Sequence, residues 1–286
     1  MNPQHPVFAT LTVLLLAGTA QAQWLNYPTP GIPRLPDGKP NLAAPPPRTA
    51  DGGPDLSGLW ATPCSAGAQQ PECPPNPERL FFDLAKDLKS SEVEMTPWAA
   101  AIQKQRESRD HVDDPYGYCL PPGVPRIHMV GVYRILLAPG VTVFLHETSA
   151  GLMFRQVFTD GRPLPTVTEP TWLGYSVGRW EGDTFVVETS GFRDRGWLDT
   201  LKGRPHSDAL HVTERFQRRD FGHIDLAITI NDPKAFVRPW TVKTVITLQA
   251  DTEILESFCD NHDKTMEHRL ITPPPPEPPS VAVPKS

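Results

Sequence analysis

Three glutamates lie inside segments that alternate between apolar and polar residues, as β-strands do: Glu188, Glu214 and Glu256. Each of them has an apolar residue two positions away. Because alternate side chains of a strand share one face, the pattern predicts that these carboxylates point toward an apolar interior. Burial raises the pKa of a carboxyl group and a basic neighbour lowers it again. Such acids would serve as the acid and the base of proton-transfer chemistry.

Arg155 and His146 are the expected partners of these carboxylates, because both also lie in strand-like segments. An arginine would hold a carboxylate ionised, or would orient an anionic group of a ligand. The alternative is that the glutamates face solvent or form ion pairs across neighbouring strands, as Glu214 would with Lys243 or Arg155. The sequence leaves both interpretations open.

A second group of reactive side chains lies in the connection 191–209, which is expected to be the only long connection between neighbouring strands. Long connections in a tight meander are usually functional or disordered. His206 is the best candidate for a general base, because the ordinary pKa of histidine is about 6.5. Asp199 and Trp197 lie in the same connection. Ser207 and His206 make a poor nucleophilic pair, since adjacent residues seldom point at each other and the G-x-S-x-G motif is missing.

Further candidates for ligand contact are basic and aromatic. Arg126 ends the rigid segment 121–126 (PPGVPR), which leads with His128 into the first long barrel strand. Its guanidinium would suit a carboxylate or a phosphate, and a purely structural turn is the equal alternative. Trp172 and Tyr175 offer faces on which a ring would stack, although aromatic residues in barrels are more often core.

Several function classes are disfavoured by what the sequence lacks. No P-loop, dinucleotide fingerprint, H-E-x-x-H motif or haem C-x-x-C-H motif is present, so no cofactor is expected. The spacing of His206, Asp208 and His211 matches no known zinc motif, so no metal site is predicted. A net charge of −6 without a basic run argues against nucleic acid and anionic membrane surfaces as partners. A small molecule is the expected partner.

The N-terminal segment indicates export. Residues 7–18 (VFATLTVLLLAG) are apolar, and residues 20–22 (AQA) have the small-x-small pattern of a cleavage site. Residues 1–22 are therefore predicted to be a secretory signal peptide, and the apolar run is too short to span a membrane. The mature protein is expected to be periplasmic or secreted, without a membrane anchor.

The four cysteines fit an exported chain with two disulfides. Cys64 and Cys73 bracket a short polar loop, which favours a local bridge between them. Cys119 with Cys259 would then tie the front of the core to its last strand. Four cysteines allow three pairings, and a zinc site would need closer C-x-x-C pairs.

The elements that must position these side chains are mostly β-strands. A strand at 55–60 would open the sheet, with Trp60 plugging one end. Short turns separate the later strands, which are predicted at 133–137, 141–148, 153–159, 175–180, 184–190, 210–218, 224–230, 241–248 and 253–259. Consecutive strands on tight turns imply an antiparallel up-and-down sheet, and so many strands favour closure into a lipocalin-like barrel. One helix is predicted at about 97–109, with Thr96 as its N-cap.

Outside this barrel domain, at 55–271, the chain is rich in proline. Residues 23–54 form a predicted extended strap, and residues 272–286 form a disordered tail with nothing to bury. The strap holds the repeat R-x-x-D-G-x-P-[ND]-L, which ends at Leu42 and again at Leu56. The repeat predicts a turn followed by an apolar anchor on the domain, and a peptide-like recognition arm is the alternative.

A set of motifs resembles an uncharacterised family of exported bacterial proteins. The motifs are DLSGLW (55–60), CLPPGVPR (119–126), GRWEGDT (178–184), FRDRGWLD (192–199), PHS (205–207) and VTERF (212–216). The resemblance covers most of residues 24–259 and implies a lipocalin-like barrel, but no reaction. Arg193 and Tyr175 depart from the asparagine and histidine of the family pattern, which implies a different choice of ligand.

The sequence therefore predicts an exported protein that binds a small apolar or aromatic ligand in a β-barrel pocket, since a barrel of about eight strands holds one small ligand. One alternative is a cofactor-independent acid–base enzyme (a hydrolase, lyase or isomerase) that uses His206 with Glu188 or Glu214. The other is a structural envelope protein that contacts partners through its proline-rich ends.

Overall fold

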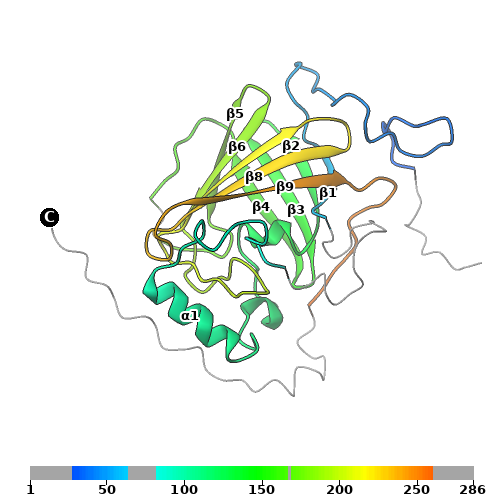
Figure 1. The fold of residues 1–286 in the computed structure, drawn as a ribbon. Helices are drawn as coiled ribbons and strands as arrows, with labels where there is room; N and C mark the ends of the chain where they lie inside the picture. Colours follow the sequence, from blue (N-terminus) through cyan, green and yellow to red (C-terminus); the bar gives the residue numbers. More distant parts are fainter. Residues whose placement is uncertain (1–27, 64–81, 167–168, 260–286) are drawn as a thin grey trace, which may run out of the picture.

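The computed structural model describes residues 28–63, 82–166 and 169–259. The predicted signal peptide, Cys64, Cys73 and the predicted tail lie outside these residues. Nine strands form a closed barrel (Figure 1), which confirms the predicted mostly-β, lipocalin-like class. The strands are β1 (Gly58–Ala61), β2 (Gly131–Ala138), β3 (Val141–Thr148), β4 (Gly151–Phe158), β5 (Tyr175–Glu181), β6 (Thr184–Ser190), β7 (His211–Arg218), β8 (His223–Asn231) and β9 (Trp240–Leu248).

Each strand pairs with the next along the chain, and β9 returns to β1 through the pair of Trp60 and Leu248. All pairs are antiparallel except β4 with β5, which are parallel and share only two residue pairs, beginning at Val157 and Ser176. The prediction of a wholly antiparallel meander is wrong at this point. Residues 159–174 form a second long connection, and a connection of that length allows the chain to return and start a parallel strand.

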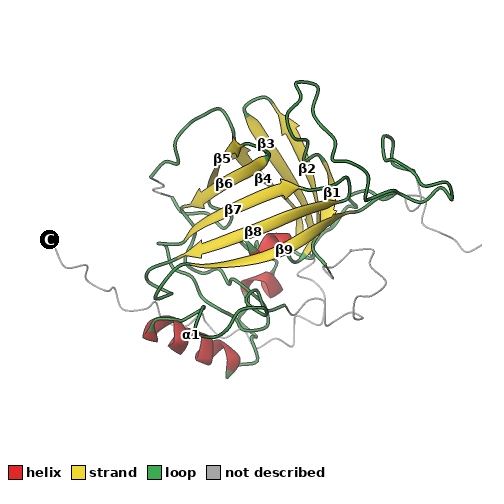
Figure 2. Ribbon diagram, turned by 45° about the horizontal axis from the view of Figure 1, so that its top comes forward, coloured by secondary structure: helices red, strands yellow, loops and turns green. Residues whose placement is uncertain are grey.

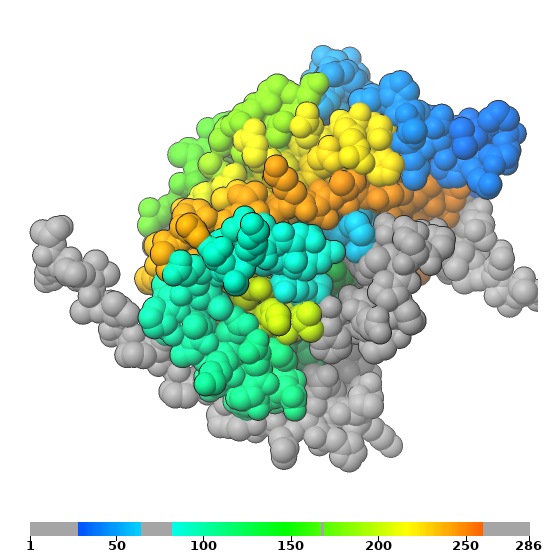
Figure 3. Space-filling model, in the orientation of Figure 1, coloured from blue at the N-terminus to red at the C-terminus, as the bar shows by residue number. Residues whose placement is uncertain are grey.

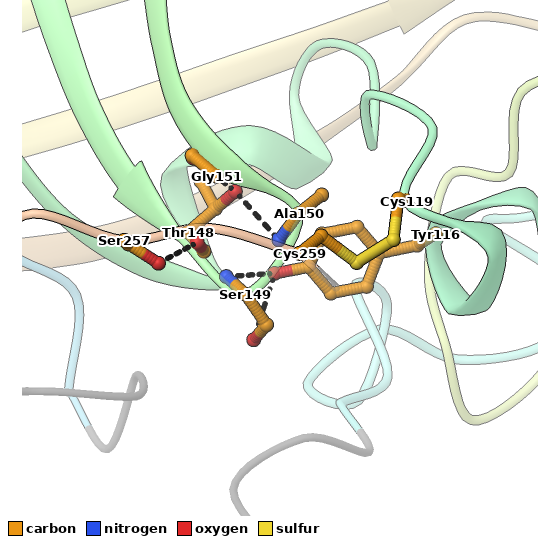
Figure 4. The surroundings of a disulfide bond; sticks show 8 residues. All are labelled: Tyr116, Cys119, Thr148, Ser149, Ala150, Gly151, Ser257 and Cys259. Carbon is orange, nitrogen blue, oxygen red and sulfur yellow. Dashed lines mark hydrogen bonds between the residues drawn. A yellow bond between two sulfur atoms is a disulfide. The ribbon is translucent and has the colours of Figure 1, made fainter. Parts of the chain in front are cut away.

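The segment 253–259 is not a strand, so the predicted last strand is wrong. It runs beside the β3–β4 turn, where Ser257 Oγ donates to Thr148 O at 2.8 Å. The disulfide between Cys119 and Cys259 fastens it there (Figure 4), which confirms that predicted pairing. This bridge joins the loop before β2 to the chain that follows β9.

One end of the barrel, here called the loop end, is covered by the helix α1 (Pro97–Glu107) and by the loops that follow β6 and β8 (Figure 2). The helix begins as predicted, because Thr96 Oγ1 accepts from Ala99 N at 3.3 Å. Two short 3₁₀ helices precede β2: η2 (Pro115–Tyr118) and η3 (Arg126–His128). The helix η3 is buried and reaches the barrel interior.

The opposite end, here called the strap end, carries the repeats of the proline-rich segment, on the far side of the barrel from α1 (Figure 3). Arg34 pairs with Asp251 at 2.5 Å and Arg48 pairs with Asp183 at 3.0 Å. The first arginine of each repeat therefore forms an ion pair with an aspartate of the barrel domain. Leu56 is fully buried. Within the described residues the segment therefore lies as an anchored strap.

Apolar side chains fill the barrel interior, among them Trp60, Ile135, Phe144, Val157, Phe185, Val187, Phe216, Leu226, Ile228 and Ile246. Trp60 lies at the strap end, where the guanidinium of Arg218 stacks 4.8 Å from its ring centre. Position 178 on the inner face of the barrel wall requires a glycine, since a Cβ there would come within 2.6 Å of the Phe185 ring. The aromatic packing thus reaches from the strap end toward a polar layer near the loop end.

Candidate functional site

Five polar side chains meet inside the barrel near the loop end, and they are here called the polar layer: His128, Tyr133, His146, Arg155 and Glu214. All are buried, with at most 2% of their surface exposed. Tyr133, His146, Arg155 and Glu214 come from β2, β3, β4 and β7, and His128 enters from η3. The inward face of each strand supplies one of the four wall residues, so the barrel itself brings them together.

Glu214 and Arg155 form the charged centre of the polar layer. Glu214 Oε2 accepts from Arg155 Nη2, and Oε1 lies 3.2 Å from Arg155 Nη1. Arg155 also donates to Ser176 Oγ at 3.1 Å and to Thr189 Oγ1 at 2.8 Å. Burial by itself would raise the pKa of Glu214, but Arg155 and His128 outweigh it and lower that pKa to about 2. The carboxylate is therefore ionised and its charge is balanced.

His128 makes the third contact of this centre. Its Nε2 lies 2.7 Å from Glu214 Oε1. Nε2 also lies 3.3 Å from the donor Arg155 Nη1, but the contact with Glu214 is much shorter. An ionised carboxylate only accepts hydrogen bonds, so the shorter contact assigns the proton of the neutral imidazole to Nε2 and leaves Nδ1 with a lone pair. Burial lowers the pKa of His128 despite the opposing effect of Glu214, so the ring is neutral at pH 7.

Four polar atoms of the layer have no hydrogen-bond partner among the described residues: Tyr133 Oη, His146 Nδ1, His146 Nε2 and His128 Nδ1. A buried polar group without a partner costs about 1–3 kcal/mol, and native proteins contain few of them. The three rings lie together, with centres 4.9 Å apart for His128 and Tyr133, 5.2 Å for His128 and His146, and 5.0 Å for Tyr133 and His146. The unpartnered atoms therefore form one cluster.

Burial shifts the remaining groups of the layer toward their neutral forms. It lowers the pKa of His146 well below its ordinary value, and His128 and Arg155 add to that effect. It raises the pKa of Tyr133 well above its ordinary value, with Glu214 adding to it. Both side chains are uncharged at neutral pH, so each offers hydrogen-bonding groups without charge.

The barrel wall is only briefly paired beside this layer. β4 pairs along its whole length with β3, but pairs with β5 only at its last two residues. The rest of β4 has no described partner on the edge that faces β5. Met153 lies in this part and points inward, and it is only partly buried. Arg155 crosses this gap to reach Ser176 and Thr189. The gap is here called the β4–β5 seam.

Of the glutamates predicted to point inward, only Glu214 does so. Glu188 faces outward, with 33% of its side chain exposed, and pairs with Arg179 at 3.3 Å. Val186, which suggested an inward face, is buried on the outer side between the cross-strand neighbours Arg179 and Arg215. Glu256 is exposed in the segment that is not a strand, so strand alternation does not apply to it.

The residues predicted in the loop 191–209 are buried and serve to hold that loop. Asp199 pairs with Arg204, which also contacts Asp83 at 2.5 Å. Burial raises the pKa of Asp199 although Arg204 opposes it. His206 is 4% exposed and its Nδ1 lies 3.1 Å from Ser207 O. Burial lowers the pKa of His206.

The other predicted ligand contacts lie outside the polar layer. Arg126 is buried and forms a two-point ion pair with Asp114, at 2.8 and 2.6 Å. Trp197 is buried under the guanidinium of Arg106, 4.4 Å from its ring centre. Tyr175 stacks on Phe158 and accepts from Arg162, and Trp172 is partly buried beside Arg193. Only Arg155, His146 and Glu214 of the predicted site residues come together.

Sequence reasoning did not assign a site role to His128 or Tyr133. Tyr133 opens a predicted strand, where an aromatic residue fits the core equally well. His128 lies in no strand, so alternation gives no signal for it. The sequence PPGVPR before His128 predicts a rigid turn, which is the feature that aims the histidine into the barrel.

Within the described residues no group of three or more histidine, cysteine, aspartate or glutamate side chains is arranged to hold a metal ion. No helix in the described part of the chain is long and apolar enough to cross a membrane. Comparisons with models of protein families, with curated proteins and with solved structures find no match to this chain.

Proposed function

We propose that this protein binds one small, largely apolar or aromatic molecule inside its barrel, against the polar layer. The observation that carries the proposal is the cluster of four buried polar atoms on Tyr133, His146 and His128 that find no partner in the described part of the chain. A ligand that supplied these partners would recover part of the free energy that their burial costs.

The surroundings of the layer favour an aromatic or aliphatic ligand body. Phe144 and Phe216 lie against His128, with ring centres 5.7 and 6.0 Å away. Pockets for small molecules are typically lined by such side chains, with a few polar groups that fix orientation. The ligand would thus place its apolar body among the phenylalanines and its polar group at the layer.

Access would use the β4–β5 seam, because side chains fill the layer and some of them must move to admit a ligand. Met153 is the inward-facing side chain of the seam that is partly exposed, and methionine adapts its shape readily. Trp172 and Tyr175 lie in and just after the connection that borders the seam. They would be the first aromatic residues met by an approaching ligand.

We further propose that the protein is exported and acts in the periplasm or outside the cell. The disulfide between Cys119 and Cys259 supports this, because disulfides persist in oxidising compartments. Membership in the uncharacterised family of exported bacterial proteins is part of the same proposal.

An acid–base enzyme on the same layer is the second candidate. The observation in its favour is the pair of Glu214 and His128, in which a carboxylate fixes the tautomer of a histidine whose other nitrogen is unpartnered. An enzyme of this kind would lose several orders of magnitude in turnover on His128→Asn while it still bound substrate. A binding protein would have no turnover to lose.

Native mass spectrometry of the mature protein, purified from its own host compartment, tests the binding proposal. We expect a bound small molecule that organic extraction releases and identifies. A protein that carries nothing from its host, and that takes up no apolar or aromatic molecule from a broad panel, would contradict the proposal.

A further inference from the structure

The chemical class of the ligand can be narrowed further by the hydrogen-bonding capacity and charge of the polar layer, if the proposed function holds. His128 supplies the first constraint. Because Nε2 donates to Glu214, Nδ1 is an acceptor, and it is buried without a donor among the described residues. The group that completes this site must carry a hydrogen that it can donate.

The second constraint is charge. Glu214 and Arg155 neutralise each other, while His128, His146 and Tyr133 are uncharged at neutral pH. Each guanidinium nitrogen of Arg155 already has an acceptor in Glu214, Ser176 or Thr189. The remaining N–H of Nη1 lies beside His128 Nε2. An anionic ligand would thus meet a positive charge that Glu214 already balances, and burial of a further negative charge would be costly. The ligand is neutral.

The third constraint is that the ligand group must also accept. Tyr133 Oη is a donor as well as an acceptor, and one nitrogen of neutral His146 is a donor. Both rings lie within 5.2 Å of the His128 ring, centre to centre. A hydroxyl group donates one hydrogen and accepts through its lone pairs, so it fits all three side chains at once.

We propose that the ligand is a neutral hydroxylated aromatic compound, and that its hydroxyl group donates to His128 Nδ1 and accepts from Tyr133 or His146. The aromatic part follows from Phe144 and Phe216, which lie against His128. This inference rests on the proposed function, but it also makes a separate claim about discrimination between ligands of equal shape.

Titration calorimetry of the mature full-length protein with p-cresol and p-xylene tests that claim, because the two probes differ only by a hydroxyl in place of a methyl group. We expect p-cresol to bind at least about tenfold more tightly, since a polar site left unpaired by the analogue discriminates strongly. Equal binding of both probes would overturn the hydroxyl inference and leave the binding function standing. Binding of neither probe would overturn the inference; the host-derived extract would then decide the binding function separately.

Two further measurements keep the inference falsifiable. His128→Phe keeps an aromatic ring but removes the acceptor, so it should abolish the preference for p-cresol; a folded variant that keeps the preference would contradict the assignment. The visible absorption of 4-nitrophenol does not require a variant. The bound molecule should remain neutral at a pH at which the free molecule is largely ionised, whereas a bound phenolate would overturn the claim that the site takes a neutral ligand.

Discussion

His128 Nε2 lies 2.7 Å from Glu214 Oε1 inside the barrel, although the two residues are 86 positions apart in the chain. The contact joins η3, which reaches the barrel interior, to the β7 wall of the barrel. It also fixes which nitrogen of the histidine carries the proton. The same contact therefore contributes to the fold and sets the hydrogen-bonding properties of the polar layer.

Glu214→Gln should be strongly destabilising. The variant leaves the Arg155 guanidinium buried without a counter-charge, and loss of one partner of a buried ion pair typically costs about 3–5 kcal/mol. The free energy of unfolding from urea denaturation measures the effect. Glu188→Gln is the matched control, because Glu188 is partly exposed on the outer face of the barrel, and it should change stability little. Equal effects of the two substitutions would mean that Glu214 is not paired in the interior.

Stability should fall as the solution is acidified from neutral pH. Burial lowers the pKa of three histidines, His128, His146 and His206, below the ordinary value of 6.5. The unfolded chain then binds protons at a pH at which the folded protein does not, so the stabilisation present above pH 6.5 is lost toward the lower folded pKa values. Glu214 does not contribute in this range, because its pKa is lowered from 4.5 to about 2.

The free energy of unfolding at about pH 7 and at about pH 5 measures this dependence. His146→Gln should reduce the slope, since the variant lacks one of the three histidines whose pKa is lowered. An unchanged slope in a folded variant would show that His146 titrates normally in the folded protein and is not buried in its neutral form.

The barrel was predictable from the sequence because most of its strands are local patterns joined by short turns. The parallel pairing of β4 with β5 was not, since two residue pairs after a long connection leave no local signal. The segment 253–259 alternates like a strand, yet it is held by the disulfide of Cys259 and by the side chain of Ser257 rather than by backbone pairing with a strand. Alternation of apolar and polar residues does not by itself distinguish a paired strand from an extended segment that is held by side chains.

The candidate site was predictable only in part, for a related reason. Alternation placed Glu214 on the inner face, and Arg155 and His146, which were named as possible partners of the glutamates, lie there with it because all three belong to regular strands. It failed for Glu188, because the outer face of β6 also buries the apolar residue Val186. It gave no information about His128, whose position depends on η3 and on the packing of the whole loop end.

Loss of the disulfide should loosen the loop end. The bridge joins residues 140 positions apart, and removal of a native disulfide of this kind typically costs about 2–5 kcal/mol. Cys119→Ser with Cys259→Ser should therefore unfold at lower urea concentration, and hydrogen exchange should increase in residues 115–128 and 253–259. Unchanged exchange in these segments would contradict the anchoring role of the bridge.

Enlarging the side chain at the β4–β5 seam should slow the uptake of ligand. Met153→Trp adds bulk on the inward face of β4, in the part that has no described partner on the β5 side, and stopped-flow binding of p-cresol should show a lower association rate. Phe154→Trp is the matched control, because Phe154 is the adjacent residue on the outer face and is 65% exposed. Equal association rates in the two variants would place the route of access elsewhere.

The most direct test of ligand binding at the polar layer is native mass spectrometry of the host-purified wild type beside the double variant Tyr133→Phe with His146→Leu. The variant keeps the apolar packing and removes three of the four unpartnered atoms. The expected result is a bound small molecule on the wild type and its loss from the folded variant. A variant that carries the same molecule at the same occupancy would contradict the assignment of the ligand site to the polar layer.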